Sequence, residues 1–270
     1  MERRGFVKSA LAATASVMAA TLFTPGTLAA TVKDLPENGT IDGLIVSETL
    51  EFKNGENGSV KLFVSRPKAE GKYKPILIGH GFGDATYLTY TATRFALAGY
   101  AAFAILEIVK DNKPLEYLGI GRAYTASVEQ LFSKDFVVAN QLALLGYCGA
   151  GTETLRIAAK APLVKAVVTV YGDVTIAADR LPKEVIENLN IPIQSHFGLM
   201  DTVFPLESTR IYEGILKRSN KRSSVFFYEN CGHSYCNFSI AQGAEPGFDY
   251  NFEAAMKTYD RAIAFLKKYY

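Results

Sequence analysis

The chain has 270 residues, of which 49% are hydrophobic, and its formal net charge is +2. This length is enough for one sizeable hydrophobic core and requires no second domain. The balanced charge excludes a strongly basic protein, and the sequence holds no nucleic-acid-binding motif, so nucleic acid is not expected as a partner.

The first 30 residues have the pattern of an export signal. Arg3 and Arg4 precede an apolar stretch over residues 9–23, and small residues end the segment at Ala29 and Ala30. This stretch is shorter than the roughly 20 residues that span a bilayer, so we expect cleavage after Ala29 or Ala30 and no stable membrane anchor. The paired arginines favour export by twin-arginine machinery, with an ordinary secretory signal as the alternative. The predicted location is the periplasm or the exterior.

Residues 31–270 have the pattern of one α/β domain. Residues 48–52 and 59–65 alternate apolar and polar residues around the turn 54–58, which predicts an antiparallel hairpin at the edge of a sheet. Continuous apolar runs predict buried strands, mainly parallel, at residues 76–78, 100–106, 142–145 and 166–170. Helical spacing of apolar residues predicts helices at residues 87–98, 125–140, 152–159, 206–218 and 252–268. A mainly parallel sheet with helices on both faces follows.

Residues 146–151, Gly-Tyr-Cys-Gly-Ala-Gly, join a predicted strand directly to a predicted helix. A sharp turn of this kind forces its central residue into a strained conformation and tolerates only small neighbours. The helix N-terminus would face the sulfur of Cys148, favour its thiolate form and offer the Gly149 amide to an oxyanion. A lone cysteine is more often inert packing, but this context favours a nucleophile.

A cysteine nucleophile needs a base, and His233 lies in a polar loop after the predicted strand 224–228. His196 lies within a predicted buried strand, which indicates a structural imidazole instead. Asp201 follows that strand and would orient the base, which gives the chain order nucleophile, acid, base. Asp173 also follows a strand and is the alternative acid.

The turn after the strand 76–78 is rich in glycine, and the Gly81 amide is the candidate second donor to an oxyanion. The neighbouring His80 has three open roles: turn residue, group that tunes the cysteine, or substrate contact. The sequence contains no metal-ligand cluster, dinucleotide fingerprint or phosphate-binding loop, so neither a metal nor a cofactor is expected.

Two further cysteines, Cys231 and Cys236, flank His233. In an oxidising compartment they would pair and make the loop around the histidine rigid, and Cys148 would remain the free thiol. A short closed loop gains little entropy from a crosslink, so reduced thiols are the alternative. The sequence leaves both alternatives open.

The residues around these three candidates resemble the dienelactone hydrolase family, which implies an α/β-hydrolase fold. The resemblance rests on Gly-Tyr-Cys at 146–148, Gly-Leu-Met-Asp-Thr-Val-Phe-Pro at 198–205 and His-Ser at 233–234, and extends from the hairpin to the C-terminal helix. It implies that Cys148 is the nucleophile, Asp201 the acid and His233 the base. It also implies that the amides of Gly81 and Gly149 form the oxyanion hole.

Four positions depart from the best-known members of that family, one of them Ala150, which replaces a glycine in the turn around Cys148. Where those members have a glutamate that holds the resting cysteine, this sequence has His80. Where they have two arginines that bind a substrate carboxylate, it has Lys110 and Asn237. Residues 110–126 form the least regular internal stretch, which we expect to be a wall of the substrate pocket or a plain surface connection.

The activity expected from these residues is hydrolysis of a small ester or lactone through a thioester on Cys148. A protein of another class remains the alternative, namely an exported binding or scaffold protein that retains the hydrolase fold without turnover.

Overall fold

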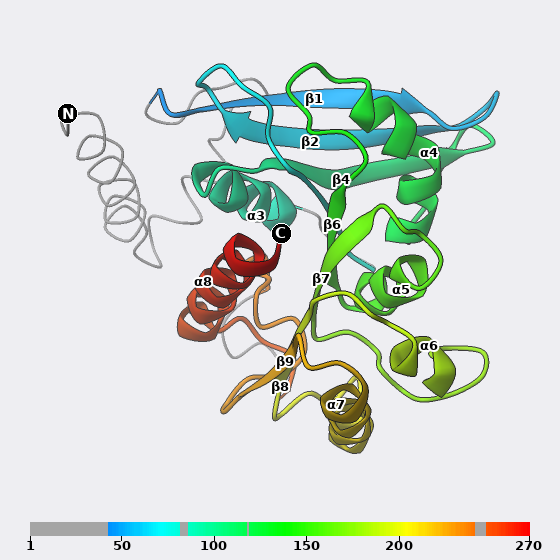
Figure 1. The fold of residues 1–270 in the computed structure, drawn as a ribbon, viewed down its shortest axis with the longest axis vertical. Coiled ribbons are helices and arrows are strands. Elements are labelled where there is room, and N and C mark those ends of the chain that lie inside the picture. The colour runs from blue at the N-terminus through cyan, green and yellow to red at the C-terminus, as the bar shows by residue number, and fades with distance from the viewer. Residues whose placement is uncertain (1–42, 82–85, 118, 241–246) are drawn as a thin grey trace. The chain divides into compact units, whose positions relative to one another are not determined.

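The structure is a computed structural model that describes residues 43–81, 86–117, 119–240 and 247–270. The predicted export signal, with cleavage at Ala29 or Ala30, lies outside the described residues. The described strands are β1 (Ile45–Lys53), β2 (Ser59–Pro67), β3 (Pro75–Gly79), β4 (Ala101–Lys110), β5 (Lys113–Pro114), β6 (Leu142–Tyr147), β7 (Val164–Val170), β8 (Ile193–Gly198) and β9 (Ser223–Tyr228). They form one sheet in the order β1-β2-β4-β3-β6-β7-β8-β9, with β5 paired to β4 (Figure 1).

Strands β1 and β2 are the predicted hairpin at the edge of the sheet. They pair antiparallel, from Ile45 opposite Pro67 to Lys53 opposite Ser59. The turn is closed by the Asn54 amide, which donates to the Gly58 carbonyl at 2.8 Å. Strand β2 then pairs antiparallel with β4, so the hairpin extends the sheet on one side.

The central strands are parallel, as predicted. Strand β3 pairs in parallel with β4 and β6, and β6, β7, β8 and β9 continue the parallel sheet. Every residue of β3, β6 and β8 is buried, which explains the continuous apolar sequences of β3 and β6. Because carboxyl ends of parallel strands meet at one edge, the segments that follow β3, β6 and β8 approach one another there.

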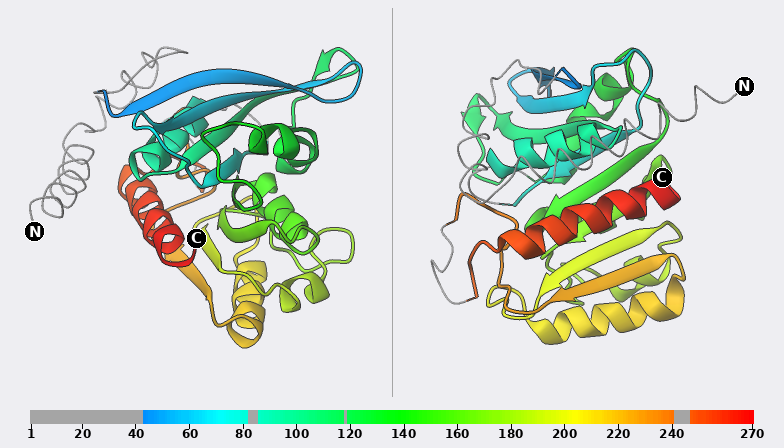
Figure 2. Two further views of the ribbon diagram at one scale, coloured as in Figure 1. Left: turned by 45° about the horizontal axis from the view of Figure 1, so that its top comes forward. Right: turned by 90° about the vertical axis from the view of Figure 1, so that its left-hand side faces the viewer.

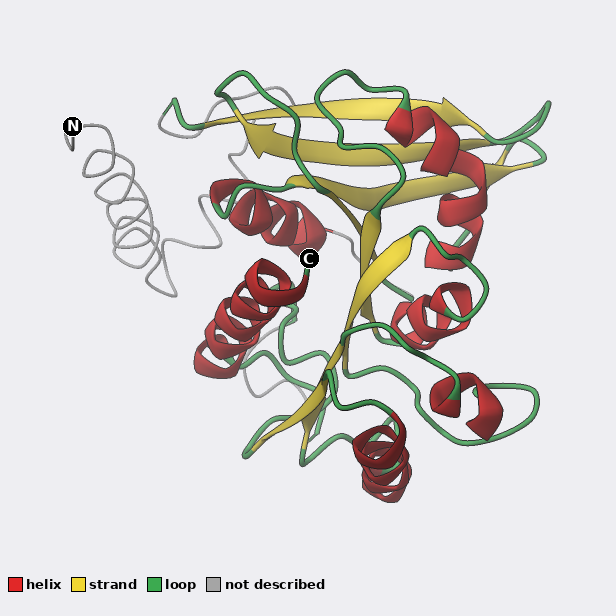
Figure 3. Cartoon of the chain, in the orientation of Figure 1, coloured by secondary structure: helices red, strands yellow, loops and turns green. Residues whose placement is uncertain are grey.

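Helices cover both faces of this sheet. Helices α3 and α8 lie on one face, and α4, α5, α6 and α7 lie on the other (Figures 1, 2 and 3). Their bounds are α3 (Thr86–Leu97), α4 (Ile120–Phe132), α5 (Gly149–Ala158), α6 (Lys183–Glu187), α7 (Leu206–Ser219) and α8 (Phe252–Tyr269). The predicted α/β architecture is therefore confirmed, and α6 is a short helix that the sequence pattern did not predict.

The boundaries of α4 differ from the prediction of a helix over residues 125–140. The helix begins at Ile120, within the stretch that we expected to be irregular, because Ile120 and Leu131 belong to one buried face. The apolar residues beyond Phe132 do not continue it. The Tyr73 amide donates to the Phe136 carbonyl at 2.8 Å, so this segment is extended and pairs with the residues before β3.

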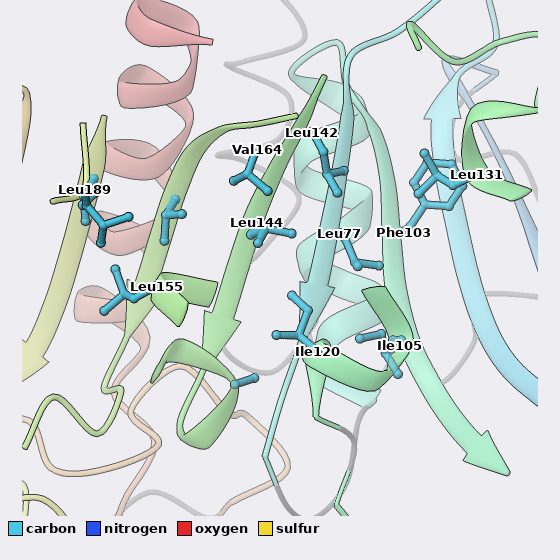
Figure 4. Close-up of a cluster of buried hydrophobic side chains, with 14 of the residues drawn as sticks. Leu77, Phe103, Ile105, Ile120, Leu131, Leu142, Leu144, Leu155, Val164 and Leu189 are labelled. Carbon is cyan, nitrogen blue, oxygen red and sulfur yellow. The ribbon is translucent and has the colours of Figure 1, made fainter. Parts of the chain in front are cut away.

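Large apolar side chains of the sheet pack against α4 and α5 in one core (Figure 4). Each buried Leu, Ile or Phe contributes about 1.5–3 kcal/mol. Helix α4 contributes Ile120 and Leu131, and α5 contributes Leu155. Strand residues that meet them, all fully buried, include Leu77, Phe103, Leu142 and Leu144. This packing holds the N-terminus of α5 at the end of β6.

The described part of the chain contains neither a candidate membrane span nor a metal-binding cluster. No helix there is long and apolar enough to cross a membrane. No cluster of three or more His, Cys, Asp or Glu side chains is placed there to hold a metal ion.

Candidate active site

Cys148 occupies a strained turn between β6 and α5. Its backbone angles are φ 54° and ψ −133°, and α5 begins at the next residue. A non-glycine residue with positive φ costs free energy and persists only where its surroundings enforce it. Gly146 is one reason that the turn can form, because a Cβ atom there would lie 2.6 Å from the carbonyl carbon of Ala150. The predicted strand, sharp turn and helix are therefore present, with Cys148 at their centre.

His233 and Asp201 are brought together by the loops after β9 and β8. The Nδ1–H of His233 donates to Asp201 Oδ2 at 2.9 Å, and both side chains are buried. The second carboxylate oxygen of Asp201 accepts hydrogen bonds from the amides of Val203 at 2.8 Å and Phe204 at 3.0 Å. Three donors thus fix the carboxylate, and the carboxylate fixes the imidazole.

The alternative acid, Asp173, has other partners. Its carboxylate forms an ion pair with Arg180 at 2.7 Å and accepts from the Thr175 amide at 3.0 Å. Of the two aspartates, only Asp201 has a hydrogen bond to His233 among the bonds of the described residues.

Hydrogen bonds determine the protonation of His233. Burial alone would lower the pKa of its imidazole, but hydrogen bonds to Asp201 and to the sulfur of Cys148, together with their negative charges, raise that pKa to about 9. The imidazole therefore carries a proton at neutral pH when it faces a thiolate. Asp201 and Cys148 thus both act on the His233 imidazole.

Aromatic rings enclose the His233 imidazole. The ring centroids of Tyr171, Phe204 and Phe248 lie 5.0, 5.1 and 5.7 Å from that of His233. The His233 amide also donates to the carbonyl of Gly247 at 2.6 Å. Backbone and ring contacts together restrict the orientation of the imidazole.

Gly81 and Gly149 lie next to the sulfur. A Cβ atom at position 81 would lie 3.2 Å from the Gly149 amide nitrogen and 3.4 Å from Cys148 Sγ. Because glycine has no Cβ, no side chain at position 81 blocks the approach to these two atoms. Gly149 is the first residue of α5, where an amide has no partner within the helix. The two glycines thus border a space within reach of both a nucleophile and an amide donor.

The other two histidines are structural or undecided. His196 is fully buried in β8 and bonded on both nitrogens, to Tyr228 and to Gln194, each at 2.9 Å. Burial lowers the pKa of this imidazole to about 3, so it is neutral, in agreement with the structural role predicted for it. His80 is buried at the end of β3, with its ring edge-on to Tyr87 at 5.3 Å.

Lys110 and Asn237 have different surroundings. Lys110 is exposed at the end of β4 and lines a cavity of about 660 Å³ beside the hairpin turn. Cys148, Asp201 and His233 are not among the residues that line this cavity. Asn237 is buried, and its side-chain oxygen accepts from the Ser239 amide at 3.0 Å, which stabilises a turn.

Cys231 and Cys236 are free cysteines in the structure, and both are buried. Burial raises the pKa of the Cys231 thiol to about 11 and that of Cys236 well above its usual range. Their pairing in an oxidising compartment stays a prediction.

Two residues that border this site, Tyr117 and Glu153, were not singled out by the sequence, although Tyr117 lies within residues 110–126, which we expected to be a pocket wall or a surface connection. The ring of Tyr117 packs against Gly81 and Gly149. Glu153 accepts a hydrogen bond from the Gly121 amide at 2.9 Å. One signal for Glu153 was available: it lies in the first turn of the predicted helix 152–159, directly after the turn that holds Cys148. For Tyr117 the signal was only its place in the stretch 110–126.

Comparison with known families decides what kind of protein has this site. The model of the "Dienelactone hydrolase family" matches residues 116–270, more than half of the chain, and this match includes Cys148, Asp201 and His233. The chain belongs to the dienelactone hydrolase family. Membership in this family makes the protein a hydrolase.

Individual members of the dienelactone hydrolase family and their structural neighbours agree with this assignment. A protein of Escherichia coli strain K12, named "Putative carboxymethylenebutenolidase", is 24% identical over 263 residues, which cover 90% of this chain and 92% of the relative. A structure from Klebsiella pneumoniae, described as "Putative Dienelactone Hydrolase", has a TM-score of 0.66 at 22% identity and covers 83% of this chain and 99% of its own. Esterase Pf2001 of Pyrococcus furiosus has a TM-score of 0.64 at 13% identity, with 86% and 95% covered. At these identities the two structures show the common fold.

Proposed function

We propose that the protein hydrolyses a small ester or lactone, with Cys148 as nucleophile, His233 as proton carrier and Asp201 as the residue that orients His233. The close approach of Gly81 to the sulfur carries the proposal. A Cβ atom at Gly81 would lie 3.4 Å from Cys148 Sγ and 3.2 Å from the Gly149 amide nitrogen, so the absence of a side chain there leaves access to both groups for a carbonyl under attack. A structural cysteine in a packed core has no need of such a space.

The charges around Cys148 favour attack by a thiolate. Helix α5 begins at the next residue, and its N-terminus stabilises negative charge on the sulfur. A thiolate at Cys148 and the carboxylate of Asp201 together raise the pKa of His233 to about 9, so the imidazole that faces such a thiolate is protonated at neutral pH. The resting state in this proposal is a thiolate–imidazolium pair, with Asp201 balancing the positive charge.

The reaction proceeds in two halves. The thiolate adds to the carbonyl carbon, and the carbonyl electron pair moves onto the oxygen, which accepts from the amides of Gly81 and Gly149. When the carbonyl reforms, the leaving oxygen takes the proton of His233, and a thioester remains on Cys148. Water then gives a proton to His233 and adds to the thioester. Collapse of this second oxyanion releases the acid, and the thiolate regains its imidazolium partner.

The substrate class follows from family membership and from the chemistry of the site. The E. coli relative is named as a carboxymethylenebutenolidase, and a butenolide is a lactone. Where the best-known family members have two arginines that bind a substrate carboxylate, this chain has Lys110 and Asn237. A carboxylate is therefore not a required feature of the substrate in this proposal.

The test is hydrolysis of p-nitrophenyl acetate and a panel of simple lactones by the purified protein and its variants. Cys148→Ala and His233→Ala should each lower kcat roughly 10⁴- to 10⁶-fold, because nucleophile and base act as a unit. Cys231→Ala is the matched control, since it removes a different, buried thiol to which the proposal gives no role in the reaction. Equal rates in the parent protein and in Cys148→Ala would overturn the proposal and favour a protein without turnover.

We also propose that the protein is exported to the periplasm or exterior by twin-arginine machinery. The support is the sequence of the first 30 residues, in which Arg3 and Arg4 precede an apolar stretch. In a fractionation experiment, Arg3→Lys combined with Arg4→Lys should leave the full chain in the cytoplasm. Undiminished export of that variant would point to the ordinary secretory route.

A further inference from the structure

Tyr117 lies over Gly81 and Gly149, the two glycines beside Cys148. Its Oη and Cε2 atoms lie 3.0 and 3.2 Å from the position that a Cβ atom of Gly149 would take. Its Cε2 also lies 3.5 Å from the corresponding position at Gly81. The ring therefore packs against both glycines and forms one wall of the space beside Cys148.

Glu153 holds the Tyr117 ring in this position. The hydroxyl of Tyr117 is hydrogen-bonded to the Glu153 carboxylate, which also accepts from the Gly121 amide at 2.9 Å. Ring and carboxylate crowd Gly119 as well, where a Cβ atom would lie 2.8 and 2.9 Å from the carboxylate oxygens. The carboxylate thus joins the first turn of α4, the helix α5 and the tyrosine.

The hydroxyl of Tyr117 has its single proton committed to Glu153. Burial, followed by the charge and hydrogen bond of Glu153, raises the pKa of this phenol, so it stays protonated and remains the donor in that bond. Tyr117 therefore has no second proton to give to an oxyanion. What it presents to the open space is the edge of its ring.

We propose, on the basis of the proposed function, that Tyr117 is a specificity-determining residue that contacts the acyl group of the substrate, and that Glu153 is its positioning residue. The leaving oxygen must lie on the side of His233, because that imidazolium gives it a proton. Tyr117 borders the amide donors instead, so the acyl side is the part of the substrate that meets the ring. A wall fixed in this way limits the size of that group.

The experiment compares kcat/KM for p-nitrophenyl hexanoate with that for p-nitrophenyl acetate. Tyr117→Ala removes the wall and should raise the hexanoate-to-acetate ratio at least about tenfold, since room for even one methylene changes discrimination about 10- to 200-fold. Tyr124→Ala is the matched control: it removes a half-buried tyrosine from α4, seven residues further on, and should leave the ratio unchanged. An unchanged ratio in Tyr117→Ala would overturn the assignment.

Two further variants keep the test valid if Tyr117→Ala folds poorly. Tyr117→Phe keeps the ring but loses its anchor, and it should lower kcat for the acetate about three- to tenfold. Glu153→Ala should produce the same loss of kcat, and the double variant Tyr117→Phe with Glu153→Ala should lose no more than either single variant. Glu153→Gln keeps a hydrogen-bond acceptor and should retain most of the parental kcat. Additive losses would show that Glu153 does not act through Tyr117.

The two proposals fail in different ways. If Cys148→Ala turns over both esters at the parental rate, the proposed function fails. If Cys148→Ala is inactive while Tyr117→Ala leaves the ratio unchanged, the function stands and only the role of Tyr117 is refuted.

Discussion

Gly81→Ala is the substitution whose effect the geometry defines best. The new methyl group would lie 3.2 Å from the Gly149 nitrogen and 3.4 Å from Cys148 Sγ, so it would crowd the space in front of both groups, into which the carbonyl oxygen must move. The substrate oxygen could then no longer reach the amide of Gly149. Loss of one oxyanion donor lowers kcat about 10²- to 10³-fold, equivalent to about 3–4 kcal/mol of transition-state stabilisation. We expect a loss of at least this size.

The assay for Gly81→Ala is steady-state hydrolysis of p-nitrophenyl acetate, with the thermal unfolding midpoint measured on the same samples. Gly214→Ala is the matched control, because its new methyl group meets only the flexible Arg218 side chain, at 3.4 Å, within α7. Alanine is the better residue in a helix interior, so this control should be fully active and slightly more stable. Activity of Gly81→Ala within threefold of the parent protein would refute the placement of the oxyanion.

Three other predictions concern the acid, the pH dependence and the core. Asp201→Asn should lower kcat at least about 10²-fold. Asp173→Asn loses only a partly exposed ion pair with Arg180, so its kcat should stay within a few-fold of that of the parent protein. The reverse order would assign the acid to Asp173. Because the pKa of His233 is raised from 6.5 to about 9, its contribution to the stability of the fold is complete below pH 6.5 and is lost as the pH rises through 9. The value of kcat/KM should fall over the same pH range. An NMR titration should give a lower pKa for His233 in Cys148→Ala, and an identical pKa would contradict the contribution of the sulfur. Leu144→Ala should lower the free energy of unfolding by about 2–5 kcal/mol in chemical denaturation, against less than about 0.5 kcal/mol for the exposed Ile211→Ala, and similar losses would contradict the assigned core.

The parts of the fold that were predictable from the sequence have strong local signals. The doubly buried strands β3 and β6 appear as uninterrupted apolar runs, and the small residues around Cys148 mark a turn that admits no side chains. The end of α4 had no such signal. Phe136 and the two valines after it continue the apolar spacing, and only their pairing with Tyr73 shows that the chain is extended there.

The candidate site could be predicted only in part, for a similar reason. Cys148, Asp201 and His233 each follow a strand, and the topology of a parallel sheet brings such segments together. Tyr117 precedes a helix and reaches the site only through the packing of α4 against α5. Tyr117 contacts Gly81 and Gly149, which lie more than 30 residues before and after it in the sequence. This contact depends on tertiary structure and cannot be inferred from local sequence patterns.

The identity of the nucleophile is the central claim, and trapping the covalent intermediate tests it most directly. Acid quenching during turnover of p-nitrophenyl acetate preserves a thioester, and mass spectrometry of the digested protein locates the acetyl group. We predict one acetyl group on the peptide that contains Cys148, and none on that peptide in Cys148→Ala. Turnover with the acetyl group on another residue, or undiminished acetylation in Cys148→Ala, would contradict the account.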